Sequence, residues 1–132
     1  MTVNYFLKGK SLRPLKILLL DDSSVLQKLQ AKMFDSMGHE TTVASGCESG
    51  VEIVRNQNFD IILMDINMPP GCNGLECTRK IRSMGIQTPI IALSGNSVES
   101  SKDECFAAGM NAYLEKPASK ADFNALISAL LE

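Results

Sequence analysis

The sequence predicts an α/β domain in which five parallel strands form a doubly wound sheet. Short apolar runs alternate five times with amphipathic segments of helical length. The links between these segments are short, which favours consecutive βα units with right-handed crossovers and helices on both faces of the sheet. With 132 residues, 45% of them hydrophobic, the chain has the size and composition of one globular domain.

Each predicted strand is a short apolar run. Residues 16–20 and 59–64 are almost wholly apolar, as expected of strands that are buried on both faces. Residues 40–44 contain the run TTV, whose β-branched side chains favour extended structure. The last two strands are predicted over 89–93 and 112–115.

The helices are predicted from apolar residues that recur at helical spacing and from their end signals. They are expected over residues 24–37, 48–56, 73–84, 98–108 and 120–130. The first helix has four apolar side chains on one face and ends at Gly38. The fourth has Asn96 or Ser97 as a possible N-cap and Gly109 as a stop. The last has apolar residues at i, i+3, i+4 and i+7.

The ends of the predicted strands carry the candidate functional residues. A five-stranded sheet of this class has the flavodoxin-like order 2-1-3-4-5, whose switch point lies between strands 1 and 3. Ligands of such sheets bind outside the carboxyl ends of the strands. Asp21 and Asp22 follow the first strand, and Asp65 follows the third. The residue pattern and the topology therefore predict the same location for a site.

Three aspartates that converge in one pocket repel one another, and a divalent cation relieves the repulsion. Mg²⁺ prefers oxygen ligands and typically combines one or two carboxylates with waters and phosphate oxygens, and Mn²⁺ also suits carboxylates. The sequence therefore predicts a Mg²⁺ (or Mn²⁺) site that accepts a phosphoryl group. Asp65 is the candidate nucleophile, since a carboxylate can attack phosphorus to form an aspartyl-phosphate.

Two further residues complete the predicted catalytic set with Asp65. Lys116 follows the fifth strand and supplies a compact positive charge for Asp65 or a phosphoryl oxygen. Ser94 ends the fourth apolar run and offers a hydroxyl donor. Phosphoryl transfer depends mainly on positioning and electrostatic stabilisation, so these few groups suffice.

These pieces, in this order and each after an apolar run, resemble the receiver domain of two-component response regulators over roughly residues 15–131. The motifs are DD after KILLL, then MDINMP, IIALS and EKP. The resemblance implies that Asp22 is a direct metal ligand and that Asp21 acts through water. It also implies that Asp65 is the phosphoacceptor and that Asn67 gives its backbone carbonyl to the metal.

The same resemblance implies how the other residues act. Ser94 matches the family's switch hydroxyl, Tyr113 its switch aromatic and Lys116 its lysine. On phosphorylation, Ser94 would move toward the phosphoryl group and Tyr113 into the vacated space. The face made by helix 4, strand 5 and helix 5 would then change shape for a downstream effector. The bond between Lys116 and Pro117 is expected to be cis.

The implied function is that of a phosphoacceptor module in a His-to-Asp phosphorelay. It would catalyse only its own phosphorylation and dephosphorylation and would turn over no metabolite. The donor would be a phosphohistidine on a histidine kinase or phosphotransfer protein, which docks near residues 25–29 of helix 1 and near Pro117 in the loop between strand 5 and helix 5.

One departure from the family pattern lies beside the site. Gly74 follows Asp65 by nine residues, whereas the common form has the glycine eight residues after the phosphoacceptor. The intervening loop is therefore one residue longer, with a turn predicted at Pro70 and Gly71. Because this loop borders the site, its length bears on metal affinity and on the lifetime of the phosphoryl group.

Three other functions compete with this prediction. A phosphatase that works through an aspartyl-phosphate usually has a second acid two residues after the nucleophile, where Asn67 stands. An FMN-binding protein of this fold needs a phosphate-binding loop after strand 1, where Asp21 and Asp22 would repel phosphate. A pseudo-receiver, which binds partners without phosphorylation, would lack acids or the lysine, and none is missing.

Charge and hydropathy set the remaining expectations. Residues 1–14 are predicted to form a basic, solvated tail before a receiver domain at 15–132. The net charge of −2 does not suggest direct binding to nucleic acid. No apolar run approaches the roughly 18–20 residues needed to span a bilayer. A cytoplasmic, intracellular location is predicted, and the sequence is also consistent with a place in a membrane-anchored hybrid kinase or in a eukaryotic nucleus. In such a reducing location the four cysteines are predicted to be thiols.

Overall fold

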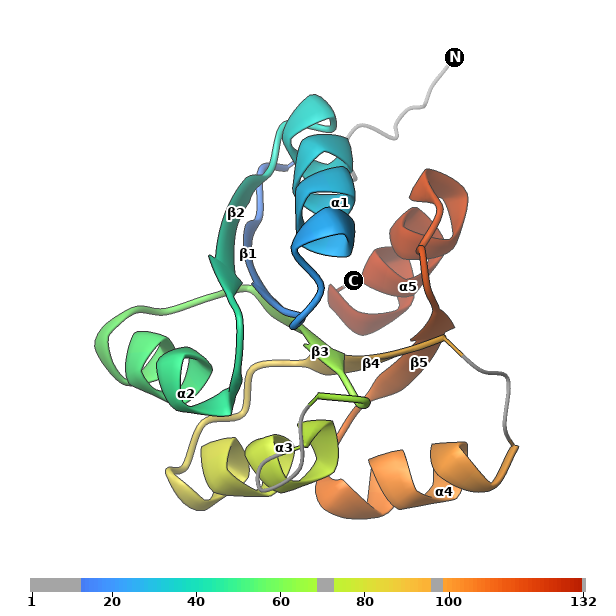
Figure 1. The fold of residues 1–132 in the computed structure, drawn as a ribbon. Coiled ribbons are helices and arrows are strands. Elements are labelled where there is room, and N and C mark those ends of the chain that lie inside the picture. The colour runs from blue at the N-terminus through green and yellow to red at the C-terminus, as the bar shows by residue number, and fades with distance from the viewer. Residues whose placement is uncertain (1–12, 69–72, 96–98, 132) are drawn as a thin grey trace.

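The computed structural model describes residues 13–68, 73–95 and 99–131, which form five strands and five helices (Figure 1). All strand pairs are parallel, and the strand order is β2-β1-β3-β4-β5. The predicted α/β class, the doubly wound sheet and the 2-1-3-4-5 order are therefore confirmed.

The strands are β1 (Lys16–Leu20), β2 (Glu40–Ala44), β3 (Ile61–Asp65), β4 (Ile90–Ser94) and β5 (Ala112–Glu115). The helices are α1 (Ser24–Ser36), α2 (Cys47–Asn56), α3 (Gly74–Ser83), α4 (Glu99–Ala108) and α5 (Lys120–Leu131). The predicted bounds of β1, β2 and β5 are confirmed. β3 begins two residues and β4 one residue later than predicted. Each also runs one residue past the predicted end, because Asp65 still pairs with Leu93 and Ser94 with Glu115. The predicted caps at Asn96 and Ser97 and the predicted Pro70–Gly71 turn lie outside the described residues.

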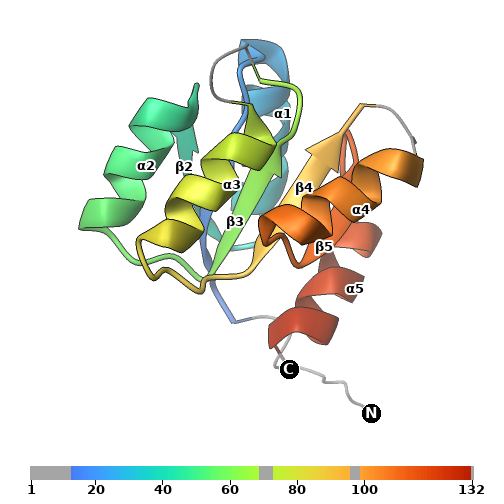
Figure 2. The ribbon, with the colours of Figure 1, turned by 90° about the horizontal axis from the view of Figure 1, so that it is seen from below.

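The helices cover the sheet in two layers. α1 and α5 lie on one face, and α2, α3 and α4 lie side by side on the other (Figures 1 and 2). Successive residues of a strand point to opposite faces of the sheet and pack against the helices on that face. In β1, Ile17 and Leu19 pack toward Phe34 of α1 and Phe123 of α5, whereas Leu18 packs into the cluster on the opposite face. Burial on both faces explains the continuous apolar runs of the central strands.

Local signals set the helix ends. Ser23 caps α1 by accepting a hydrogen bond from the backbone N–H of Leu26. Asn73 and Glu76 form a reciprocal capping box at the start of α3. Gly38 and Gly109 follow their helices with positive φ angles of 92° and 113°, as the predicted stops require.

The described cysteines include both free thiols and a disulfide-bonded residue. Cys77 and Cys105 are free and buried, and burial raises the pKa of the Cys77 thiol to about 11, so it stays protonated at neutral pH. Cys47 is disulfide-bonded, so the prediction that all four cysteines are thiols is wrong for this residue. The sequence spacing contained no signal for that bond, because a disulfide depends on how distant segments approach.

The basic tail is described only at its end, where Nη1 of the exposed Arg13 lies 3.7 Å from Oδ1 of the half-buried Asp60. Leu15, the next residue but one, is already buried. None of the helices in the described ranges has the length and apolar character needed to cross a bilayer.

Candidate functional site

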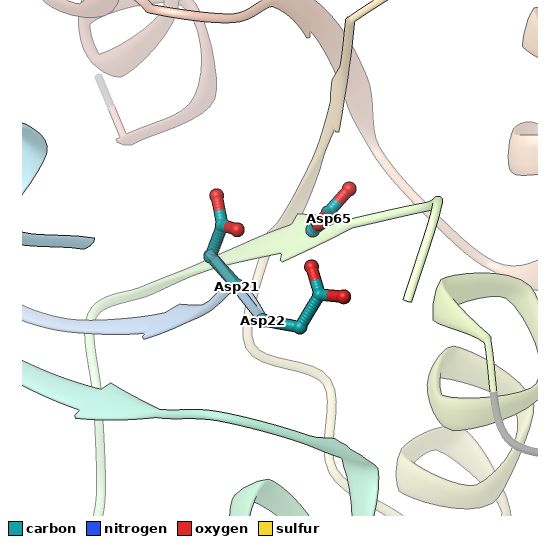
Figure 3. A group of neighbouring side chains, drawn as sticks. All are labelled: Asp21, Asp22 and Asp65. Atoms are coloured by element: carbon teal, nitrogen blue, oxygen red, sulfur yellow. The ribbon is translucent and has the colours of Figure 1, made fainter. Parts of the chain in front are cut away.

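Three carboxylates meet at the carboxyl ends of β1 and β3. Oxygens of Asp21, Asp22 and Asp65 lie within 4.8 Å of one another, and the three side chains extend into the same space (Figure 3). Asp21 and Asp65 are buried, with 0% and 1% of their surface exposed, whereas Asp22 is exposed. The residues that the sequence predicted to converge are therefore brought together.

Backbone N–H groups orient the two buried carboxylates. The N–H of Ser23 donates to Oδ1 of Asp21, and the N–H of Asn67 donates to Oδ1 of Asp65, both at 2.9 Å. In each case the donor lies two residues after the aspartate, which is the geometry of an Asx turn. Both Oδ1 atoms are thereby satisfied and held in place.

The other oxygen of each buried carboxylate faces the ammonium group of Lys116. Oδ2 of Asp21 and Oδ2 of Asp65 are buried and accept no hydrogen bond from the part of the chain that is described. Nζ of Lys116 lies 3.2 Å from Oδ2 of Asp65 and 3.6 Å from Oδ2 of Asp21. One ammonium group thus faces two buried carboxylates, and Asp22 adds a third negative charge nearby.

This arrangement fits a divalent cation. Three carboxylates against one lysine leave an excess of negative charge, and burial makes unpaired charge costly. The ligand atoms are all oxygens, and one carboxylate is exposed, which leaves room for waters in a coordination shell. Hard cations such as Mg²⁺ prefer such a donor set.

The side chains of Ser94 and Tyr113 lie on the same face of the sheet. Tyr113 pairs with Ala92, two residues before Ser94, and side chains two apart in a strand share a face. Ser94 is buried and Tyr113 is half-buried against the cluster under α2, α3 and α4. Nζ of Lys102 on α4 lies 5.4 Å from the centre of the Tyr113 ring.

The loop after β5 brings Lys116 to the site. The N–H of Lys116 donates to the backbone oxygen of Ser94 at 2.8 Å, which extends the β4–β5 pairing past Glu115. The bond between Lys116 and Pro117 is cis, as the resemblance implied. The Lys116 side chain is only 11% exposed.

Sequence reasoning missed Gln27 and Ser23. The side-chain amide of Gln27 on α1 donates to the backbone oxygen of Asp21, which ties the helix to the acidic loop. Ser23 was readable as an N-cap, because a serine directly before a helical pattern is a common start signal. The contact of Gln27 had no such signal, since it depends on the angle at which α1 leaves the loop.

The comparisons with known proteins agree with this geometry. The family model described as "Response regulator receiver domain" matches residues 17–128. Two-component response regulator 24 of Arabidopsis thaliana is 35% identical over 104 residues, which cover 78% of this chain and 74% of that protein. The sensor histidine kinase RcsC of Escherichia coli is 31% identical over 101 residues, or 76% of this chain but only 10% of the kinase.

Solved structures are also similar. The receiver domain of the sensor histidine kinase PA1611 of Pseudomonas aeruginosa, solved with a magnesium ion in its active site cleft, has a TM-score of 0.78 and 34% identity, with 88% of this chain and 96% of that chain covered. The chemotaxis protein CheY4 of Vibrio cholerae has a TM-score of 0.81 at 24% identity, with 89% of this chain and 98% of that chain covered, and shows the common fold.

Proposed function

Because this chain belongs to the response regulator receiver family of two-component signalling, we propose that it is the phosphoacceptor module of a His-to-Asp phosphorelay, with Asp65 as the acceptor. The observation that carries the proposal is the charge arrangement at the strand ends. Three carboxylates lie within 4.8 Å of one another, and Lys116 reaches the buried carboxylate of Asp65 at 3.2 Å.

Asp21, Asp22 and Asp65, together with the backbone carbonyl of Asn67, would hold Mg²⁺ or Mn²⁺. The family resemblance implies that Asp22, which is exposed, would ligate the ion directly and that the buried Asp21 would contact it through water. A bound divalent cation supplies positive charge that neutralises an incoming phosphoryl group. The magnesium ion in the PA1611 receiver, at 34% identity, supports the same cation here.

The chain's own residues perform the transfer. A carboxylate oxygen of Asp65 attacks the phosphorus of a phosphohistidine, the P–N bond breaks, and the imidazole leaves with the electron pair. Lys116 then pairs with a phosphoryl oxygen, and Ser94 donates its hydroxyl to another. The Asn67 N–H keeps the attacking carboxylate oriented. Hydrolysis of the aspartyl-phosphate resets the module, and no metabolite is turned over, since this is a signalling domain and not a metabolic enzyme.

Partner surfaces follow from exposure. Val25 and Leu29 lie four residues apart on α1 and are 66% and 56% exposed, an apolar pair on one helix face beside the site. We assign this pair, with the exposed Pro117, to the histidine kinase or phosphotransfer protein. The effector would bind the α4–β5–α5 face, where Phe106 is 50% exposed, after Ser94 and Tyr113 change position.

The chain spans only a tenth of the sensor kinase it matches and half of the transcriptional regulator CtrA of Caulobacter vibrioides. We propose that its output runs through another chain or another segment and not through direct contact with nucleic acid. An intracellular, cytoplasmic location is proposed, with a membrane-anchored hybrid kinase or a eukaryotic nucleus as the other settings in which such a module works.

The test is phosphorylation by acetyl phosphate, with and without Mg²⁺, read by intact-protein mass. Wild type should gain one phosphoryl group only with Mg²⁺, and Asp65→Asn should gain none. Asp35→Asn, a change at an exposed aspartate near the end of α1, is the matched control and should behave as wild type. If a phosphohistidine donor also fails to load wild type, the alternative of a pseudo-receiver that binds partners without phosphorylation takes the place of this proposal.

A further inference from the structure

Gly74, the first residue of α3, sits directly against the main chain of the proposed phosphoacceptor. A Cβ atom at this position would lie 2.6 Å from Cα of Ile66 and 3.0 Å from the carbonyl carbon of Asp65, and closer still to the Asp65 oxygen. Atoms at such distances overlap, so a side chain here would require the Asp65–Ile66 peptide to move.

That peptide is also held from the opposite side. The N–H of Ile66 donates to the backbone oxygen of Leu93 at 3.1 Å, which continues the β3–β4 pairing. The peptide therefore lies between β4 and the first turn of α3, and a displacement of it would strain its hydrogen bond to Leu93. The next N–H, that of Asn67, orients the Asp65 carboxylate.

We propose that Gly74 is a positioning residue for Asp65: its bare Cα lets α3 pack onto the Asp65–Ile66 peptide and sets where the carboxylate points. The inference rests on the proposed function, because it gives a reason why that carboxylate must be held. Mg²⁺ tolerates little departure from octahedral geometry, so a shift of a few tenths of an ångström in a ligand's main chain weakens binding. Small displacements of a reacting group also slow transfer steeply.

Gly74 contacts the Asp65–Ile66 peptide even though the loop before α3 is one residue longer than in the common family form. Gly74 stands nine residues after Asp65, yet it makes the close contact with the nucleophile's own peptide. The start of α3 is additionally fixed by the capping box, in which Oδ1 of Asn73 accepts from the N–H of Glu76 at 3.0 Å. The contact at Gly74 and the capping box together fix the start of α3 against the Asp65–Ile66 peptide.

Gly50 provides a matched control. A Cβ there would overlap the end of the Leu20 side chain, with Leu20 Cγ at 3.0 Å, so the clash falls on a side chain and not on main chain. Gly50 lies inside α2, where alanine is intrinsically favoured by about 1 kcal/mol, and Gly74 begins α3, where helix propensity does not disfavour alanine. Any loss in either alanine variant therefore reports the contact and not the helix.

The experiment compares Gly74→Ala with Gly50→Ala in three measurements: Mg²⁺ affinity by calorimetry, phosphoryl loading by acetyl phosphate, and hydrogen exchange of the Ile66 amide by NMR. We expect Gly74→Ala to bind Mg²⁺ at least tenfold more weakly, to load at least tenfold more slowly and to exchange the Ile66 amide at least tenfold faster. Gly50→Ala should stay within twofold of wild type in all three after correction for global stability.

Equal losses in both variants, or a folded Gly74→Ala protein with wild-type Mg²⁺ affinity, would overturn the positioning role. If Gly74→Ala does not fold, Asn73→Ala is the second test, because it removes the N-cap of α3 without adding a Cβ atom at Gly74. Ser119→Ala, which removes the corresponding cap of α5, is its control. Only Asn73→Ala should then speed Ile66 exchange and weaken Mg²⁺ binding. A wild type that neither binds Mg²⁺ nor accepts a phosphoryl group would overturn the proposed function instead, while the Ile66 exchange comparison would still decide whether Gly74 holds this peptide.

Discussion

Nζ of Lys116 lies 3.2 Å from Oδ2 of Asp65. Asp65 ends β3 and Lys116 follows β5, and β4 lies between these two strands. The long lysine side chain therefore crosses a whole strand to reach the carboxylate. It also approaches Asp21 at 3.6 Å, so one cation from β5 faces acids from both β1 and β3. This cation and a divalent metal ion would share the same carboxylates.

Replacing Lys116 by methionine is expected to change Mg²⁺ binding and phosphoryl loading in opposite directions. The change keeps an unbranched side chain but removes the charge that repels a metal ion, an effect of about 1 kcal/mol or more at such distances. Mg²⁺ should bind roughly fivefold more tightly, while loading by acetyl phosphate should slow at least tenfold because no ammonium group stabilises the transferred phosphoryl group. Lys120→Met, at an exposed position on α5, is the control. Weaker Mg²⁺ binding by Lys116→Met would contradict the shared use of the carboxylates.

Mg²⁺ is expected to stabilise the folded protein, because it would bind an assembled cluster of carboxylates that the unfolded chain lacks. At a hundredfold excess over its dissociation constant, a ligand adds about 2.7 kcal/mol to the free energy of unfolding. Thermal unfolding with EDTA and with Mg²⁺ should show this rise for wild type. Asp22→Ala should lose most of it, whereas Asp122→Ala, at an exposed aspartate on α5, should keep it. An equal rise in Asp22→Ala would show that the metal binds elsewhere.

His39 is expected to make the fold sensitive to mild acid. Its Nδ1 accepts the N–H of Leu15 at 3.1 Å, and its ring packs edge-on to Phe123 with centres 5.8 Å apart. Burial lowers the pKa of His39 below its ordinary value of 6.5. The unfolded chain therefore takes up the proton first, so stability is full above pH 6.5 and falls as the pH drops through the lowered pKa.

Urea unfolding of wild type between pH 7.5 and 5.5 measures this loss, whose slope for one proton is at most about 1.4 kcal/mol per pH unit. His39→Asn keeps an acceptor that can face Leu15 but does not titrate, so its stability should be flatter over this interval. A slope that is the same in both proteins would assign the acid sensitivity to other groups.

Arg82 is expected to contribute to stability and not to the site. Its guanidinium donates to the backbone oxygens of Gly109, Ile86 and Thr88 at 2.8–3.0 Å and to the side chain of Asn111 at 2.8 Å. This network joins α3, α4 and the starts of β4 and β5, at the end of the sheet opposite the acids. Arg82→Ala should lower the free energy of unfolding by roughly 2–3 kcal/mol, because several carbonyl groups lose a charged donor.

Chemical denaturation of Arg82→Ala and of Arg79→Ala, an exposed neighbour on the same helix, tests this contribution. Arg79→Ala should lie within about 0.5 kcal/mol of wild type. Mg²⁺ affinity should be unchanged in both proteins at temperatures where they are folded. A large loss of Mg²⁺ affinity in Arg82→Ala would connect this network to the site after all.

The sequence by itself determined the fold and the identity of the acidic cluster. Short apolar runs that alternate with amphipathic helical segments favour central strands of a covered parallel sheet, and that sheet brings the residues after β1 and β3 to one edge. The sequence pattern alone therefore identifies Asp21, Asp22 and Asp65. The predicted ends of β3 and β4 are one residue early, because a polar residue is a signal for the end of a strand, whereas strand pairing continues through Asp65 and Ser94.

Only the tertiary structure decided what holds those residues in place. The Gln27 side chain contacts the Asp21 carbonyl, and Gly74 packs onto the Asp65–Ile66 peptide. These contacts join segments that no periodic pattern relates. Periodicity and end signals describe one element at a time. The angle and depth at which two elements pack depend on the shapes of all the side chains between them, and so emerge only when the chain is folded.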